Sequence, residues 1–446
     1  GIRVKDGEDG KNNRRIDPLV KMDVSGTVTV PSHDSGLVWM IFDTSGVKPG
    51  TYRGYVRVIP LSENLTENDW AKLKFTGKYQ DIPLELEVLP FELDKAPAVP
   101  FFMFQPPRNE EFFKTMIEYG IDVFLINPWR IKAEFADDGT LRSSDTESAE
   151  KQIADLKKWA AAYGVTDKIR ISICYSAYLL FRDVYAKKRF KYGTPEWRRA
   201  WSAYVGVMRD LMAKSGIAPE RYNVEVWDEP KVKNSEELLA ACRVMYETAP
   251  EMNQMLVLAS WTFPVSSLEP LVPYVRVWNF WRDRYLGNPE YRAFIEQLRK
   301  KNKELSFYAC STSMRLDLYR YYRCHAWFGL LHNLDMISMY HLIDAPHGNY
   351  GLNSWRAVTR GGVLYLSNEK PVSSVRMECL RIGINDVKYM KKLAELLQQK
   401  PSHPAAPEAR RFLDSASARL FENIHDQEYA ERLREQAIGF ILNLSK

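Results

Sequence analysis

The sequence predicts an α/β protein built on a (β/α)₈ barrel, with an antiparallel β-sandwich before the barrel and a helical extension after it. Short alternating apolar runs fill the first part of the chain, and strand-like runs alternate with amphipathic helical segments beyond residue 98. A barrel takes about 250 residues, so a chain of 446 residues leaves room for accessory structure. We expect the sandwich at 1–95, the barrel at 98–397 and the helical extension at 398–446.

The sandwich prediction comes from runs without helical periodicity between residues 18 and 93. Gly and Pro bound these runs, and the tetrapeptide Val47-Lys48-Pro49-Gly50 is a strong turn signal between two of them. The runs are GTVTV, GLVWMIFDTS, TYRGYVRVIP and IPLELEVLPFEL. This pattern is typical of two packed antiparallel sheets.

The barrel prediction comes from eight strand-like segments, each followed by a helical one, which is the number that a closed barrel requires. The predicted strands are 100–105, 121–127, 168–176, 222–227, 254–261, 274–281, 305–311 and 334–340. The predicted helices are 109–119, 147–163, 195–214, 235–248, 266–272, 289–303, 318–332 and 375–397, and an amphipathic segment at about 405–444 packs outside the barrel.

Composition excludes several classes of protein. Apolar residues make up 45% of the chain and charged residues 27%, and the net charge of +5 is spread without a Lys/Arg block, so we expect no nucleic-acid partner. No apolar run reaches the roughly 18 residues of a membrane span. The oligomeric state is left open.

No cofactor or metal is expected. The five cysteines are widely spaced in apolar segments and form no CxxC pair, and His341 and His347 lack a recognised ligand spacing. The chain starts at Gly1 rather than Met, so its start looks processed or truncated. An export signal removed before this point would make the protein secreted, periplasmic or attached to the surface of a bacterium.

The active site of a barrel lies at the C-terminal ends of its strands. Asp228 and Glu229 end the fourth predicted strand, and Pro230 stops that strand where the two carboxylates emerge, so these two residues are the catalytic candidates. Each aromatic residue at a strand end either contacts the substrate or fills the hydrophobic core. The substrate-binding candidates are Asn127, Trp129, Tyr175, Trp261, Trp278, Trp281, Asp283, Tyr340 and Asp344.

Two adjacent carboxyl groups suit the cleavage of a glycosidic bond, which requires a proton donor and a group that stabilises positive charge at the anomeric carbon. Close like charges also raise the pKa of one carboxyl, which keeps it protonated near neutral pH. Glu225 lies on the same strand, two residues before Trp227 and three before Asp228. It either supports the pair or is a core carboxylate that an arginine of the barrel neutralises.

Several motifs resemble the catalytic domain of glycoside hydrolase family 123 and its relatives. They are VKPGTYRGYVRV and IPLELEVLPFEL, FADDGTL at 135–141, VWDEP at 226–230, and the stretch 361–393. In the last stretch the pattern of the family falls on Ser374, Arg376, Glu378, Arg381, Gly383, Asp386 and Tyr389. Asn385 and Lys388 replace acidic residues of that pattern, and Tyr340 stands where the family often has Trp.

The resemblance implies a β-N-acetylgalactosaminidase-like enzyme with a β-sandwich before its barrel, acting on an oligosaccharide or glycoconjugate. It also implies substrate-assisted retaining catalysis, in which the 2-acetamido oxygen of the sugar attacks the anomeric carbon. Asp228 then orients the acetamido group, and Glu229 acts first as general acid and then as base.

Three alternatives remain open from the residues alone. The carboxylates could cleave a sugar without an acetamido group directly, with Asp283 or Asp344 as a further carboxylate. The protein could bind glycans without catalysis. For the motif at 376–389, the structural interpretation is that its charged residues form ion pairs between the last barrel helix and the barrel.

Overall fold

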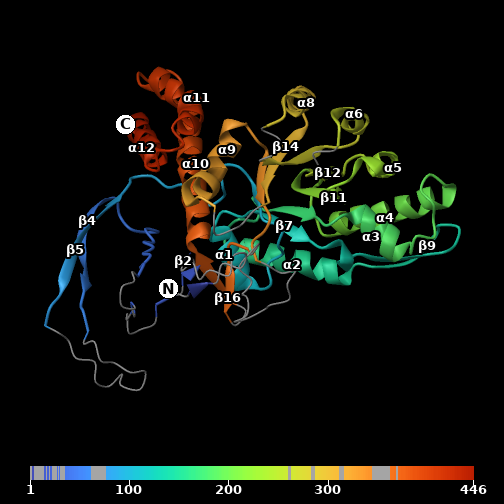
Figure 1. Ribbon diagram of the computed structural model, residues 1–446, viewed down its shortest axis with the longest axis horizontal. Coiled ribbons are helices and arrows are strands. Elements are labelled where there is room, and N and C mark those ends of the chain that lie inside the picture. The colour runs from blue at the N-terminus through green and yellow to red at the C-terminus, as the bar shows by residue number, and fades with distance from the viewer. Residues whose placement is uncertain are drawn as a thin grey trace. The chain divides into compact units, whose positions relative to one another are not determined.

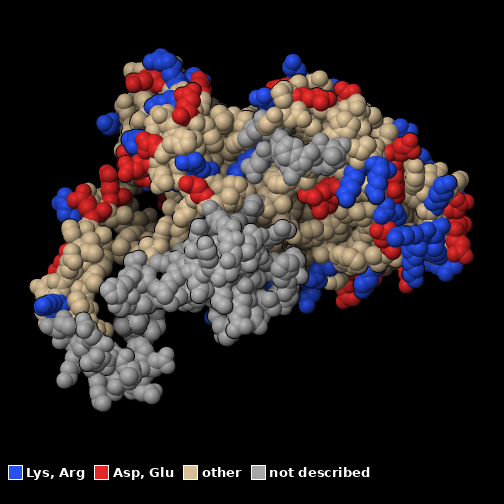
Figure 2. All heavy atoms as spheres, viewed as in Figure 1, with Lys and Arg blue, Asp and Glu red and all other residues tan. Residues whose placement is uncertain are grey.

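The computed structural model describes residues 3–4, 15–16, 18–19, 21–22, 28, 30, 36–61, 77–259, 263–282, 287–310, 316–343, 362–367 and 370–446. The chain divides into two compact units, one formed by Val38–Leu93 and the other by Gly1–Leu37 with Asp94–Lys446. Over the face that Figure 2 shows, Lys and Arg are interspersed with Asp and Glu on the described surface.

The larger unit contains a closed barrel of eight parallel strands in the order β6, β7, β10, β11, β12, β13, β14, β15, in which β15 pairs with β6 (Figure 1). The strands are β6 Phe101–Phe102, β7 Val123–Ile126, β10 Arg170–Ile173, β11 Tyr222–Asp228, β12 Asn253–Leu258, β13 Val277–Trp281, β14 Glu304–Ala309 and β15 Met336–Met339. Each lies within or beside a strand predicted from the sequence, so the predicted barrel is confirmed.

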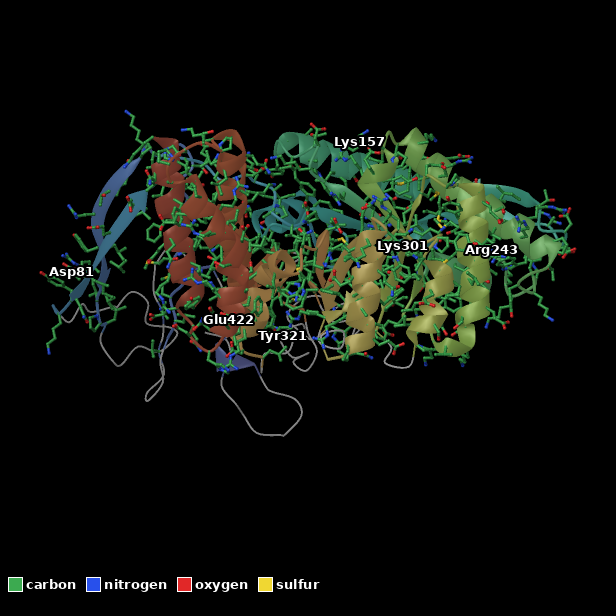
Figure 3. All side chains as sticks on the ribbon, turned by 90° about the horizontal axis from the view of Figure 1, so that it is seen from above. Asp81, Lys157, Arg243, Lys301, Tyr321 and Glu422 are labelled. Atoms are coloured by element: carbon green, nitrogen blue, oxygen red, sulfur yellow. The ribbon has the colours of Figure 1, made fainter. Side chains whose placement is uncertain are left out.

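Helices surround the barrel and follow the predicted segments closely. They are α1 Glu110–Glu118, α2 Glu147–Ala162, α4 Pro195–Lys214, α5 Ser235–Thr248, α6 Val265–Leu268, α8 Pro289–Lys300 and α9 Cys324–Leu331. The short α3, Ala177–Leu180, continues as a π-helical turn at Phe181–Tyr185. In Figure 3, Lys157, Arg243 and Lys301 mark α2, α5 and the end of α8 at the outside of the barrel.

Two hairpins were not predicted. β8 Lys132–Phe135 and β9 Leu141–Asp145 follow β7 and carry the FADDGTL motif at their turn. Gly139 in that turn has φ +83°, and a Cβ atom there would lie 2.1 Å from the carbonyl oxygen of Glu196, so the turn requires glycine. The second hairpin joins β16 Tyr365–Ser367 to β17 Lys370–Ser374, which also pairs with β3 Pro18–Leu19.

The predicted C-terminal helical extension is present as α11 Ala406–Glu422 and α12 Tyr429–Ser445, which pack beside α10 Val375–Gln399 (Figures 1 and 3). Asp386 on α10 is fully buried and accepts hydrogen bonds from Arg323, from Trp327 Nε1 and from Arg434 on α12. Asp386 therefore forms ion pairs from α10 to other helical segments, whereas Glu378 pairs with Arg381 within α10.

The smaller unit contains an antiparallel pair, β4 Gly50–Val58 and β5 Gln80–Val88. One face carries the cross-strand ion pairs Arg53–Glu85 and Arg57–Asp81, and the opposite face is apolar. The predicted run GLVWMIFDTS at 36–45 is described and contains no strand, whereas GTVTV at 26–30 lies largely outside the described residues. The sandwich and the predicted domain boundaries stay predictions. In the other unit, β1 Arg3–Val4 pairs with β2 Arg15–Ile16.

The barrel interior is filled by alternate residues of the strands, as the period of two requires. Its buried apolar cluster consists of Phe102, Phe104, Val123, Leu125, Cys174, Met255, Val257, Val277, Tyr308 and Met336. Tyr175, Ala259, Trp281, Cys310 and Tyr340 pack against this cluster and are partly buried. Among the described helices, none is both long and apolar enough to cross a membrane.

Candidate active site

A β-bulge in β11 brings two carboxylates to the same face of the strand. Glu225 lies opposite Met255 of β12, whereas Trp227 and Asp228 lie opposite Leu256 and Val257, because the register shifts between Glu225 and Trp227. Met255 and Val257 both belong to the barrel interior. In a regular strand, residues three apart point to opposite faces. The extra residue of the bulge therefore turns both Glu225 and Asp228 inward.

Glu229 follows in a tight turn with φ +45°, a left-handed conformation that is uncommon for a residue with a side chain. Its backbone N–H donates to the carbonyl oxygen of Val257 at 2.9 Å. The hydroxyl of Tyr308, from β14, donates to Glu229 Oε1 at 2.8 Å. Asp228 and Glu229 are thus held together at the C-terminal end of the barrel, where both side chains are exposed to solvent.

A second tight turn, at the end of β10, supports the same carboxylates. Tyr175 and Ser176 have φ values of +85° and +53°. The backbone N–H of Ser176 donates to Glu225 Oε1 at 2.7 Å, and the Ser176 hydroxyl oxygen accepts a hydrogen bond from the backbone N–H of Asp228 at 2.9 Å. The turn therefore connects the buried Glu225 to the exposed Asp228.

The electrostatics of the three carboxyl groups follow from burial and like charge. Desolvation and the charges of Glu225 and Glu229 raise the pKa of Asp228 to about 8, although its side chain is solvent-accessible. Desolvation also raises the pKa of Glu225, with a contribution from Glu229. Desolvation, with the charge of Glu229, raises the pKa of Tyr308 well above its ordinary value, so this phenol keeps its proton. The site therefore holds a proton near neutral pH.

Aromatic side chains lie next to the carboxylates. Trp281 stacks against Tyr308 with ring centroids 6.5 Å apart, and Tyr340 packs edge-on against Phe104 at 6.0 Å. The hydroxyl of Tyr175 donates to the carbonyl oxygen of Phe104 at 2.7 Å. Trp281, Tyr340 and Tyr175 thus pack on the same interior cluster as Tyr308, in agreement with their predicted place at strand ends.

Two other substrate-binding candidates lie at the end of β7. Asn127 Oδ1 accepts a hydrogen bond from the backbone N–H of Trp129 at 2.9 Å, and so begins the 3₁₀ turn Pro128–Arg130. The Trp129 side chain is 54% exposed, which leaves its ring accessible. Asn127 therefore has a local structural role, and its contact with a substrate stays a prediction.

The prediction for Trp278 is wrong. Its side chain is fully buried, stacks on Phe280 and packs edge-on against Phe294 of α8 with ring centroids 5.5 Å apart. Trp278 and Phe280 occupy the outer face of β13, whereas Val277 and Trp281 face the interior. Trp261, Asp283 and Asp344 lie outside the described residues.

Sequence reasoning missed Tyr308 and Ser176. Tyr308 lies within an apolar strand, where an aromatic residue is expected to fill the core, and Ser176 is a common residue at the end of a strand. Only the closed barrel places both beside β11. The alternative of an arginine partner for Glu225 is wrong, since its hydrogen bonds come from Cys174 Sγ and backbone N–H groups.

Within the described ranges, no three or more His, Cys, Asp or Glu side chains lie close enough together to hold a metal ion. The charged and polar groups around Asp228 are instead carboxyls, a thiol, a serine hydroxyl and phenols.

Comparisons with known proteins show a likeness in fold. No protein-family profile and no curated protein matches the sequence. Among solved structures, a family 123 glycoside hydrolase from Clostridium perfringens is 13% identical, with a TM-score of 0.61 over 90% of this chain and 77% of that chain.

Weaker structural matches include a GH10 xylanase from Thermobacillus composti, with 11% identity and a TM-score of 0.35 over 65% of this chain and 97% of that one. Another is a β-glucosidase from Thermotoga maritima, with 10% identity and a TM-score of 0.38 over 62% of this chain and 85% of that one. With its TM-score of 0.61, the Clostridium perfringens family 123 glycoside hydrolase is the match that shows a shared fold, over nine tenths of this chain.

Proposed function

We propose that this protein is a glycoside hydrolase that removes terminal β-linked 2-acetamido sugars, such as N-acetylgalactosamine, by substrate-assisted retaining catalysis. The observation that carries the proposal is the pair Asp228–Glu229 at the C-terminal end of the barrel, with Tyr308 bound to Glu229. Support also comes from the likeness in fold to an enzyme studied for the hydrolysis of glycolipid glycans, and from the family 123 motifs.

In the proposed first step, the acetamido oxygen of the substrate attacks the anomeric carbon while the bond to the leaving oxygen breaks. Glu229 gives its proton to that oxygen, and an oxazolinium ion forms on the sugar. In the second step, water attacks the anomeric carbon, Glu229 takes a proton from the water, and the oxazolinium ring reopens to the acetamido group. Two displacements at the same carbon retain its configuration.

Asp228 has the role of accepting the acetamido N–H and stabilising the positive charge of the intermediate. In the free protein its raised pKa means that this carboxyl binds a proton near neutral pH. A substrate N–H that donates to Asp228 favours the ionised form of its carboxylate. In this scheme the proton released from Asp228 passes to Glu229, which gives it to the leaving oxygen.

Substrate preference tests the mechanism. The purified protein is assayed on matched aryl β-glycosides that carry either a 2-acetamido or a 2-hydroxyl group. We expect hydrolysis of the acetamido sugar alone, and strong inhibition by a thiazoline analogue of the bicyclic intermediate, because such analogues make the interactions of the transition state.

The outcome that rejects substrate assistance is rapid hydrolysis of the 2-hydroxyl glycoside, or a mass increase of the protein after treatment with a 2-fluoro sugar. Either result would assign the protein to direct carboxylate catalysis. Binding of glycans without hydrolysis of either substrate would instead identify a glycan-binding protein.

A further inference from the structure

We propose that Glu225 is a positioning residue of the site, which controls the proton shared by Asp228 and Glu229 and holds Asp228 in place through Ser176. The catalytic meaning of this inference rests on the proposed function. The underlying coupling between Glu225 and Asp228 is a property of the protein that can be measured without substrate.

The first argument is the burial of Glu225 among neutral hydrogen-bond partners. The side chain is 1% exposed and lies inside the barrel. Its oxygens accept hydrogen bonds from the Cys174 thiol at 2.6 Å and from the Ser176 N–H at 2.7 Å. Among the described residues these hydrogen-bond partners are neutral, so the charge of Glu225 acts strongly on a neighbouring carboxyl in this buried setting.

The second argument is the bulge in β11. Without the extra residue, Asp228 would point away from Glu225, as strand alternation dictates. With it, the inward face of a single strand presents Glu225 and Asp228 in succession, and the turn that follows adds Glu229. Such an arrangement of like charges lowers the free energy of unfolding. It therefore serves the chemistry of the site rather than the stability of the barrel.

The third argument is a chain of contacts that leads from Glu225 to the Asp228 backbone. Glu225 binds the Ser176 N–H and so holds a turn in which two successive residues have left-handed φ. The hydroxyl of Ser176 in turn accepts the N–H of Asp228. The loss of the Glu225 carboxylate therefore changes both the charge next to Asp228 and the support of its backbone.

Among the described residues, the other titratable groups that interact with this cluster come from four strands. They are Cys174 and Tyr175 at the end of β10, Glu229 after β11, Tyr308 and Cys310 at the end of β14, and Tyr340 after β15. Arg182 lies over the Trp227 ring and pairs with Asp183 and Glu237. The carboxyl of Asp228, whose pKa is raised to about 8, is thus a group of the described cluster whose charge changes with pH near neutrality.

A thermal double-mutant cycle tests the coupling without substrate. Glu225→Gln, Asp228→Asn and the double variant are melted at pH 5 and at pH 9. The two carboxylates repel each other only when both are ionised, so Glu225→Gln should raise Tm, relative to wild type, more at pH 9 than at pH 5. This pH-dependent gain should shrink in the Asp228→Asn background. Equal effects of Glu225→Gln at both pH values would overturn the coupling.

The pH profile of kcat/KM tests the catalytic part. The alkaline limb, where the shared proton is lost, should move to lower pH by roughly one unit in Glu225→Gln, because removal of a like charge weakens proton binding. Glu304→Gln is the matched control, because Glu304 begins β14 and pairs with Arg276, at the other end of the barrel. An alkaline limb at the wild-type pH in Glu225→Gln would reject the inference.

Ser176→Ala tests the positional part and remains informative if Glu225→Gln does not fold. We expect kcat to fall about tenfold with little change in KM, since a lost hydrogen bond of about 1.4 kcal/mol corresponds to a factor of ten. Ser172→Ala is the control, because Ser172 faces the same interior but donates to Asn223. Equal kcat values in the two serine variants would contradict the positional role.

The two proposals fail in different ways. If the wild-type protein cleaves no 2-acetamido glycoside while the thermal cycle shows coupling, the proposed function is wrong and the coupling stands. If the enzyme is active while neither the thermal cycle nor the pH profile responds to Glu225→Gln, the role of Glu225 is wrong and the function stands.

Discussion

The phenol of Tyr308 on β14 donates a hydrogen bond of 2.8 Å to Oε1 of Glu229, which follows β11. Two strands, β12 and β13, lie between β11 and β14 in the barrel. The contact thus holds a candidate catalytic carboxylate in place from a strand that is not adjacent to β11. Since the pKa of Tyr308 is raised, the phenol remains a donor throughout the range of pH in which the protein would act.

Tyr308→Phe should therefore lower kcat. A hydrogen bond to a charged group contributes about 1.5 to 3 kcal/mol, so the expected loss is about 10- to 100-fold. Steady-state kinetics on a 2-acetamido aryl glycoside measure it. Tyr204→Phe is the control, because this buried phenol donates at 3.0 Å to the backbone carbonyl of Ile131 instead. A Tyr308→Phe enzyme with wild-type kcat would show that Glu229 needs no such support.

Glu229→Gln should lose most activity on substrates with poor leaving groups, since general acid catalysis contributes on the order of 10²- to 10⁴-fold. Aryl glycosides with acidic phenol leaving groups should be affected less in the cleavage step, because these groups depart without a proton. The comparison of kcat/KM across a series of leaving groups checks this. A small, uniform loss over the whole series would mean that the proton donor is another residue.

Trp278→Ala and Trp281→Ala should differ in kind. Trp278 is buried between β13 and α8, so its truncation should destabilise the fold by about 3 to 5 kcal/mol. Trp281 is partly exposed beside Tyr308, so its truncation should raise KM or lower kcat with a smaller change in Tm. Thermal melting and kinetics of both variants test this. Equal losses of Tm would place both rings in the core.

Asp122 should make stability depend on pH independently of the active site. It is buried just before β7, its Oδ1 accepts the Phe101 N–H at 2.7 Å, and burial raises its pKa to about 7 from an ordinary value of 3.8. Because the folded pKa is the higher one, the contribution of Asp122 to stability is fully present below pH 3.8 and is lost as the pH rises through 7.

Asp122→Asn removes this titration and leaves an oxygen that can accept the same N–H. The Tm of the variant relative to wild type should therefore rise between pH 5 and pH 8. Asp167→Asn, at a side chain that is 99% exposed, should show no such trend. Parallel Tm curves for wild type and Asp122→Asn would contradict the assignment of the raised pKa to Asp122.

The secondary structure and the barrel follow from local patterns in the sequence. The helices 195–214 and 235–248 were predicted with the bounds that the structure has, because their apolar residues recur at helical spacing and charged residues occupy the other face. The barrel strands were identified from runs of apolar residues, although several proved shorter than predicted. The β8–β9 hairpin was missed, since its half-exposed strands lack a continuous apolar run.

The sequence also determined where to look for chemistry, because Asp228, Glu229 and Pro230 stand at a strand end and barrel sites lie there. Only the tertiary structure decided which side chains meet. The bulge in β11 turns Glu225 inward with Asp228, and barrel closure brings Ser176 and Tyr308 to them from β10 and β14. Which face of β13 turns toward the barrel interior likewise depends on packing against α8. This orientation buries Trp278 and leaves Trp281 partly exposed. Local periodicity specifies an element, whereas contacts between residues far apart in the chain arise only when the sheet closes.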